Sequence, residues 1–140
     1  MDPDTLRTVE LERTGTGTFR ATNERGGTLD IASDSSPTFT PVELLLAAIG
    51  ACTGMDVDAI TSRRAEPELF AITVAGHKIR DAGGNRLTDI AVTFRVSFPT
   101  GGAGDAARNV LPEAVRRSHD RLCTVSRTVQ LGSPVRTTVR

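Results

Sequence analysis

Cys52 and Cys123 are the residues of this 140-residue chain whose side chains are best suited to redox or nucleophilic chemistry. A thiol reacts as the thiolate, so the charges and the burial around each sulfur decide what it can do. The cysteines do not form a CxxC pair, and the two histidines do not complete a ligand cluster, which argues against a structural zinc site. The first question is therefore whether the two thiols work together.

The surroundings of Cys52 in the sequence disfavour its thiolate. It lies inside an apolar stretch, and Asp56 follows four residues later on the same face of a helix, so burial and negative charge would both raise its pKa. A reactive Cys52 needs a cation from elsewhere in the fold, and Arg13, Arg20 and Arg25 of the N-terminal segment are the candidates. The alternative is a buried structural cysteine without a chemical role.

Cys123 has the opposite surroundings, because basic side chains flank it on both sides. These are Arg116, Arg117, His119, Arg121 and Arg127. Such a field favours the thiolate. The alternative is a half-buried thiol at the end of a helix, with arginines and a surface histidine that only face water.

The stretch Thr40–Ile60, which carries Cys52, is predicted to be a helix with a defined start. Thr40 is a favourable N-cap, Pro41 suits the first helical position, and Glu43 completes a T-x-x-E capping box. Apolar residues point in nearly every direction around Leu44–Ala51, which predicts a helix buried on most sides.

The other segments alternate strand and turn patterns with one further helix. The predicted strands are Leu6–Leu11, Gly15–Ala21, Gly27–Ala32, Leu69–Ile79, Leu87–Phe98 and Val129–Val139, with a second helix over Asp105–Leu122. The sequence DAGGN at Asp81–Asn85 predicts a hairpin turn. The order is βββ-α-ββ-α-β, which indicates one α+β domain over residues 1–140 with antiparallel sheets packed around a central buried helix.

Composition narrows the possible partners and location. Seventeen basic residues balance seventeen acidic ones, which argues against nucleic acid and anionic membranes as partners. The longest apolar run, Leu44–Ile49, is far shorter than the ~20 residues that span a bilayer, and the N-terminus lacks a secretion pattern. We therefore expect a cytoplasmic protein, in which thiols are kept reduced.

The segments around the cysteines resemble those of a known family. The stretch PVELLLAAIGACT ends just beyond the first cysteine, and SHDRLCTVSR surrounds the second. The pair is similar to motifs of the OsmC/Ohr family, named for osmotically inducible protein C and the organic hydroperoxide resistance proteins. The resemblance extends over most of the chain, and the longer pattern ending in G-M-D-V looks closer to the less characterised OsmC-like branch.

The resemblance implies a two-cysteine thiol peroxidase that reduces organic hydroperoxides in oxidative or osmotic stress defence. Cys52 would attack the peroxide and become a sulfenic acid, and Cys123 would condense with it to a disulfide. No bound cofactor is implied; an external dithiol would reopen the disulfide. The family also implies an intertwined homodimer with its sites at the subunit interface. The alternative is a non-catalytic OsmC-like protein that binds a small apolar or thiol ligand at that interface.

The family further implies that an N-terminal arginine and a helix glutamate assist the thiolate. Arg20 and Glu43 are the matching candidates, although the family glutamate directly follows the motif proline, where this chain has Val42. Nine residues separate Glu43 from Cys52, which at ~100° per residue amounts to ~900°, so the two point to opposite sides of a regular helix. The residues themselves therefore favour a capping role for Glu43.

Overall fold

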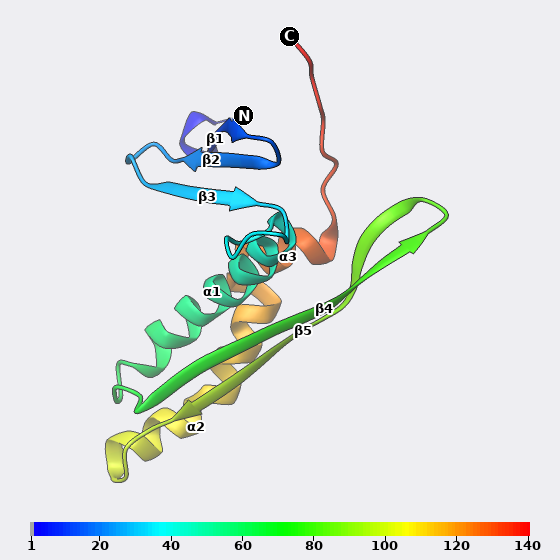
Figure 1. Ribbon diagram of the computed structural model, residues 1–140. Coiled ribbons are helices and arrows are strands. Elements are labelled where there is room, and N and C mark those ends of the chain that lie inside the picture. The colour runs from blue at the N-terminus through cyan, green and yellow to red at the C-terminus, as the bar shows by residue number, and fades with distance from the viewer. Residues whose placement is uncertain (1) are drawn as a thin grey trace. The chain divides into compact units, whose positions relative to one another are not determined.

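The computed structural model describes residues 2–140, which form two compact units: residues 2–45 and Leu46–Arg140. Figure 1 shows the succession of elements along the chain. A short 3-10 turn at Pro3–Thr5 precedes them. The α+β class with antiparallel sheets is confirmed.

The first unit contains a three-stranded antiparallel meander. Its strands are β1 (Glu10–Gly15), β2 (Thr18–Thr22) and β3 (Thr28–Ala32), paired in the order β1-β2-β3. Gly17 and Gly26 have φ values of 71° and 87°, a backbone region that favours glycine, in the two connecting turns. The predicted N-terminal meander is therefore confirmed.

Helix α1 (Pro41–Thr61) begins with the predicted capping box. The Thr40 amide donates to Glu43 Oε1 at 2.9 Å, and the Glu43 amide donates to Thr40 Oγ1 at 3.1 Å. Two amides at the start of the helix, which lack partners inside it, are thereby satisfied.

One face of α1 is buried and the opposite face is exposed. The buried face recurs at helical spacing, as adjacent pairs or single residues three or four positions apart: Ile49, Gly50, Thr53, Gly54, Val57 and Thr61. Met55 is 72% exposed, and Ala48 and Ala51 are exposed as well. Within this single chain α1 is therefore buried along one face, and its burial on most sides stays a prediction. The apolar residues surround the helix, but the chain supplies packing partners for one side.

Glycines let α1 approach strand β4 (Leu69–Asp81) closely. A Cβ atom at Gly50 would lie 2.6 Å from Val74 Cγ2, and one at Gly54 would lie 2.6 Å from Ile72 Cδ1. By length and apolar composition α1 could also cross a membrane, as could many helices that form the core of a folded domain.

Strands β4 and β5 (Gly84–Ser97) form a long antiparallel hairpin (Figure 1). Ile72 pairs with Phe94 and Val74 pairs with Val92, so branched and aromatic side chains face one another across the ladder. The register shifts between Ala75 and His77. The hairpin and its glycine-containing turn are confirmed as predicted.

The segment before Cys123 is helical in two different forms. Helix α2 (Gly102–Arg117) begins three residues before the predicted start at Asp105, and Pro112 lies within it without ending it. A π-helical turn, Ser118–Leu122, follows directly. Such turns are rare, and their wider winding changes the direction in which the following residues point.

The predicted final strand at Val129–Val139 is wrong. Helix α3 (Thr124–Leu131) covers its beginning, and Gly132, with a φ of 72°, ends that helix. Val135 and Val139 are 90% and 92% exposed, in a tail without regular secondary structure. Alternating apolar residues suit a strand only where a neighbouring strand supplies hydrogen bonds, and no strand of the described residues pairs with this tail. The predicted order therefore fails in its last element.

Candidate functional site

The two cysteines are free thiols that lie near one another in the second unit. Cys52 projects from the middle of α1 and is half-buried, whereas Cys123 immediately precedes α3 and is fully buried. The Cys123 thiol lies close enough to Cys52 to raise its pKa. The fold thus brings together two residues that are far apart in the sequence, as the pairing hypothesis requires.

Cys123 is the N-cap of α3. The Ser126 amide donates to Cys123 Sγ at 3.4 Å, and the Cys123 thiol donates to Ser126 Oγ at 3.2 Å. The sulfur thereby takes the position that a serine or aspartate oxygen usually occupies at a helix start. Sulfur at this position lies near the positive end of the helix dipole, which favours negative charge.

Opposing influences act on the pKa of Cys52. Burial raises it most, and the neighbouring Cys123 thiol and the Asp56 carboxylate raise it further. A hydrogen bond from the backbone amide of Val125 lowers it, but the net direction is upward. The first turn of α3 therefore donates one amide to each sulfur. Sequence reasoning missed this contribution, because it assigned no helix to Thr124–Leu131.

Three polar side chains form a hydrogen-bonded chain beside the thiols. Ser118 Oγ donates to Asp56 Oδ2 at 2.8 Å and lies 2.7 Å from Thr53 Oγ1. The serine proton is directed at Asp56, so the Thr53 hydroxyl donates to Ser118. Ser118 is fully buried and Thr53 is 5% exposed. No pattern in the sequence pointed to Thr53 or Ser118.

The basic residues that flank Cys123 are exposed, whereas the sulfur is buried. Arg127 donates to the Asp120 carbonyl at 2.9 Å, and His119 Nδ1 lies 2.9 Å from Asp120 Oδ1. Arg116 pairs with Glu113. These side chains bind local partners at the surface, so the expected cationic surroundings of Cys123 lie outside its immediate contacts.

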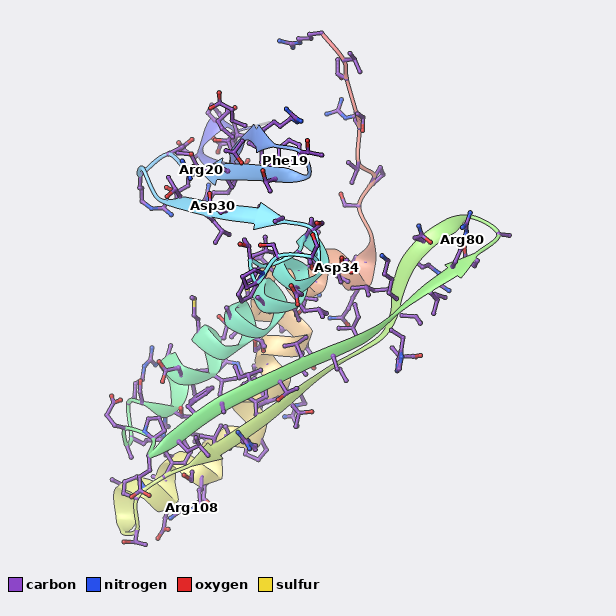
Figure 2. All side chains as sticks on the ribbon, viewed as in Figure 1. Phe19, Arg20, Asp30, Asp34, Arg80 and Arg108 are labelled. Atoms are coloured by element: carbon purple, nitrogen blue, oxygen red, sulfur yellow. The ribbon has the colours of Figure 1, made fainter. Side chains whose placement is uncertain are left out.

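Arg20 and Glu43 belong to the first unit, and each has a partner there. Arg20 Nε donates to Asp30 Oδ1 at 2.8 Å across neighbouring strands, and Figure 2 shows the two side chains side by side. Both are more than half exposed. Glu43 accepts the Thr40 amide in the capping box. A catalytic role for either residue stays a prediction.

An open cavity of about 510 Å³ lies on α1, β5, α2 and the start of α3. Most of the residues that line it are apolar: Ile90, Ala91, Val92, Phe94, Pro112 and Val115. The polar residues of the lining are Thr53, Arg116, His119 and Ser126. Thr53 adjoins Cys52 in the chain, and Ser126 is hydrogen-bonded to Cys123. Among residues 2–140, no three His, Cys, Asp or Glu side chains are placed to hold a metal ion.

Comparison with known proteins assigns the family. The model of the OsmC-like proteins matches residues 33–138, three quarters of the chain. The chain belongs to the OsmC-like family. Uncharacterized proteins of Mycobacterium bovis and Mycobacterium tuberculosis are 32% identical to it over 127 residues, covering 89% of this chain and 90% of theirs.

Solved structures of this fold are similar over most of the OsmC-like chain. A hypothetical protein from Aquifex aeolicus matches with a TM-score of 0.72 and 25% identity, over 91% of this chain and 89% of its own. An organic hydroperoxide resistance protein OsmC from Legionella pneumophila matches with a TM-score of 0.63 and 16% identity, over 90% and 91% of the two chains. At 16% identity, the similarity to the Legionella pneumophila protein shows a shared fold alone.

Proposed function

We propose that this OsmC-like protein is a two-cysteine thiol peroxidase that reduces organic hydroperoxides. The observation that carries the proposal is that the free thiols of Cys52 and Cys123 are close enough for one to raise the pKa of the other. A permanently buried structural cysteine has no need of a second thiol beside it, whereas a peroxidatic cysteine needs one to resolve its sulfenic acid.

The reaction follows from the two sulfurs. The Cys52 thiolate attacks the hydroperoxide, an S–O bond forms, and the O–O bond breaks with its electron pair on the departing alkoxide, which takes up a proton. The Cys52 sulfenic acid then condenses with the Cys123 thiol, forming an S–S bond and releasing water. An external dithiol reduces this disulfide and becomes a disulfide itself.

Two features of the site support this chemistry. The amides of Val125 and Ser126, one on each sulfur, favour negative charge where the attacking and resolving thiolates form. The apolar lining of the neighbouring cavity suits the organic group of a hydroperoxide better than it suits hydrogen peroxide. Relatives of the same fold include the organic hydroperoxide resistance protein of Legionella pneumophila.

The proposal includes a homodimer acting in the cytoplasm in stress defence. Ala48, Ala51 and Met55 leave an apolar strip exposed on α1 beside the half-buried Cys52. A second copy on this strip would bury apolar surface and enclose the thiol. Gel filtration with light scattering tests this, since a monomer has a mass of 14.9 kDa.

The decisive experiment counts thiols before and after one equivalent of cumene hydroperoxide. The wild type should lose both thiols and form an intramolecular disulfide. Cys52→Ser should not consume peroxide, whereas Cys123→Ser should stop at the sulfenic acid, which dimedone traps. Folded wild-type protein that keeps both thiols would refute the proposal.

The upward shift of the Cys52 pKa favours a second candidate, a non-catalytic protein that binds a small apolar or thiol ligand. In that case the cavity would hold its ligand without turnover, and the thiol would stay protonated at neutral pH. Slow peroxide reaction together with an alkylation profile that rises only above the ordinary thiol range of ~8.5 would support this candidate.

A further inference from the structure

Ser118 connects the two cysteine-bearing elements through its backbone and its side chain. Its carbonyl accepts the amide of Cys123 at 2.9 Å, which closes the π-helical turn. Its hydroxyl holds the turn of α1 that carries Cys52, through Asp56 at 2.8 Å and Thr53 at 2.7 Å. Two short hydrogen bonds to α1 and one to Cys123 therefore meet in a single buried residue.

We infer that Ser118 and Thr53 are positioning residues, which hold Cys123 against Cys52 for the disulfide-forming step. Neither hydroxyl needs to touch the peroxide for this role. This inference deepens the proposed function and rests on it, because it concerns the resolution of the Cys52 sulfenic acid. Resolution requires Cys123, whereas the attack of Cys52 on the peroxide does not.

Both hydroxyls of this hydrogen-bonded chain are buried, so their loss is not compensated by solvent. Ser118 is fully buried and Thr53 is 5% exposed, so water does not replace a hydroxyl that is removed there. The two hydroxyl protons run in one direction, from Thr53 to Ser118 and from Ser118 to the Asp56 carboxylate. Removal of the Ser118 hydroxyl breaks both of these hydrogen bonds between α1 and the turn, and removal of the Thr53 hydroxyl breaks one of the two.

The same helix offers a matched control. Thr61 is fully buried in α1 like Thr53, but its hydroxyl donates to the Val57 carbonyl of its own helix at 3.0 Å. Thr53→Val and Thr61→Val therefore remove the same atoms from the same helix. Thr53→Val removes one of the two hydrogen bonds between α1 and Ser118, whereas Thr61→Val removes a hydrogen bond within α1.

The test measures the Cys52–Cys123 disulfide in glutathione redox buffers, without peroxide. Oxidised glutathione accepts two electrons and the two thiols form the disulfide, so the equilibrium reports how well the sulfurs are placed. Thr53→Val should shift it toward the dithiol by about fivefold, the ratio expected for one net hydrogen bond, and Ser118→Ala, which removes two, should shift it further. Thr61→Val should match the wild type, and Thr53→Ser, which keeps a hydroxyl, should largely restore it.

A kinetic measurement separates this inference from the proposed function. After cumene hydroperoxide, Thr53→Val should accumulate more dimedone-trapped sulfenic acid than Thr61→Val, because resolution is slowed. A wild type inert to peroxide, with the glutathione difference intact, would refute the peroxidase alone. Equal glutathione equilibria for Thr53→Val and Thr61→Val would refute the positioning role. If Ser118→Ala fails to fold, the comparison of Thr53→Val with Thr61→Val still tests the positioning role.

Discussion

Glu43 can be tested as a helix cap or a catalytic group, because the two roles respond differently to the same substitutions. In the structure its carboxylate accepts the Thr40 amide at 2.9 Å, while the Glu43 amide donates to the Thr40 hydroxyl at 3.1 Å. A capping box accepts glutamine as well as glutamate at this position. A carboxylate that stabilises or deprotonates a reacting group has no such substitute.

The expected loss of stability on removing the cap follows from these two hydrogen bonds. Loss of the cap in Glu43→Ala should lower the free energy of unfolding by about 1 kcal/mol. For a domain of this length that corresponds to a fall in Tm of about 4 °C. Thr40→Ala removes the reciprocal bond and should cost about the same. Glu43→Gln should leave Tm close to that of the wild type.

The assay combines thermal unfolding, followed by circular dichroism, with peroxide consumption at a temperature where all variants are folded. With a capping role, Glu43→Gln and Thr40→Ala both retain peroxide consumption. A loss of more than tenfold in Glu43→Gln with Tm unchanged would refute our reasoning and make Glu43 part of the catalytic site. The Thr40→Ala variant controls for any effect of a frayed helix start on the thiols.

Two further predictions concern the thiol and the packing of α1. Asp56→Asn removes a negative charge that raises the pKa of Cys52, so the alkylation profile of Cys52 against pH should move downward and iodoacetamide should react faster at pH 7. An unchanged profile would mean that the carboxylate does not act on this sulfur. Gly50→Ala would place a Cβ 2.6 Å from Cγ2 of the short, branched Val74 and should lower the free energy of unfolding by about 1–3 kcal/mol in urea titrations. Gly102→Ala, where nothing lies within 4 Å of the added atom, is its control and should not destabilise the protein. Equal midpoints for the two variants would contradict the close packing.

Local signals in the sequence were sufficient for several elements. The T-x-x-E pattern determines the start of α1, because a capping box involves residues three apart. Alternating apolar residues on both sides of a glycine-containing turn determine the β4–β5 hairpin for the same local reason. The motifs around Cys52 and Cys123 also indicated the OsmC-like family, which the family match confirms.

Features that depend on distant residues were decided by the tertiary structure. The segment after Cys123 has a pattern that suits a strand or a helix, and it forms α3 in the absence of a partner strand among the described residues. The link from Ser118 to Thr53 and Asp56 joins residues more than sixty positions apart, so no local spacing announces it. The sequence determined which thiols could react. Their proximity, and the amides and hydroxyls around them, arise because folding places α3 and the π-helical turn against α1.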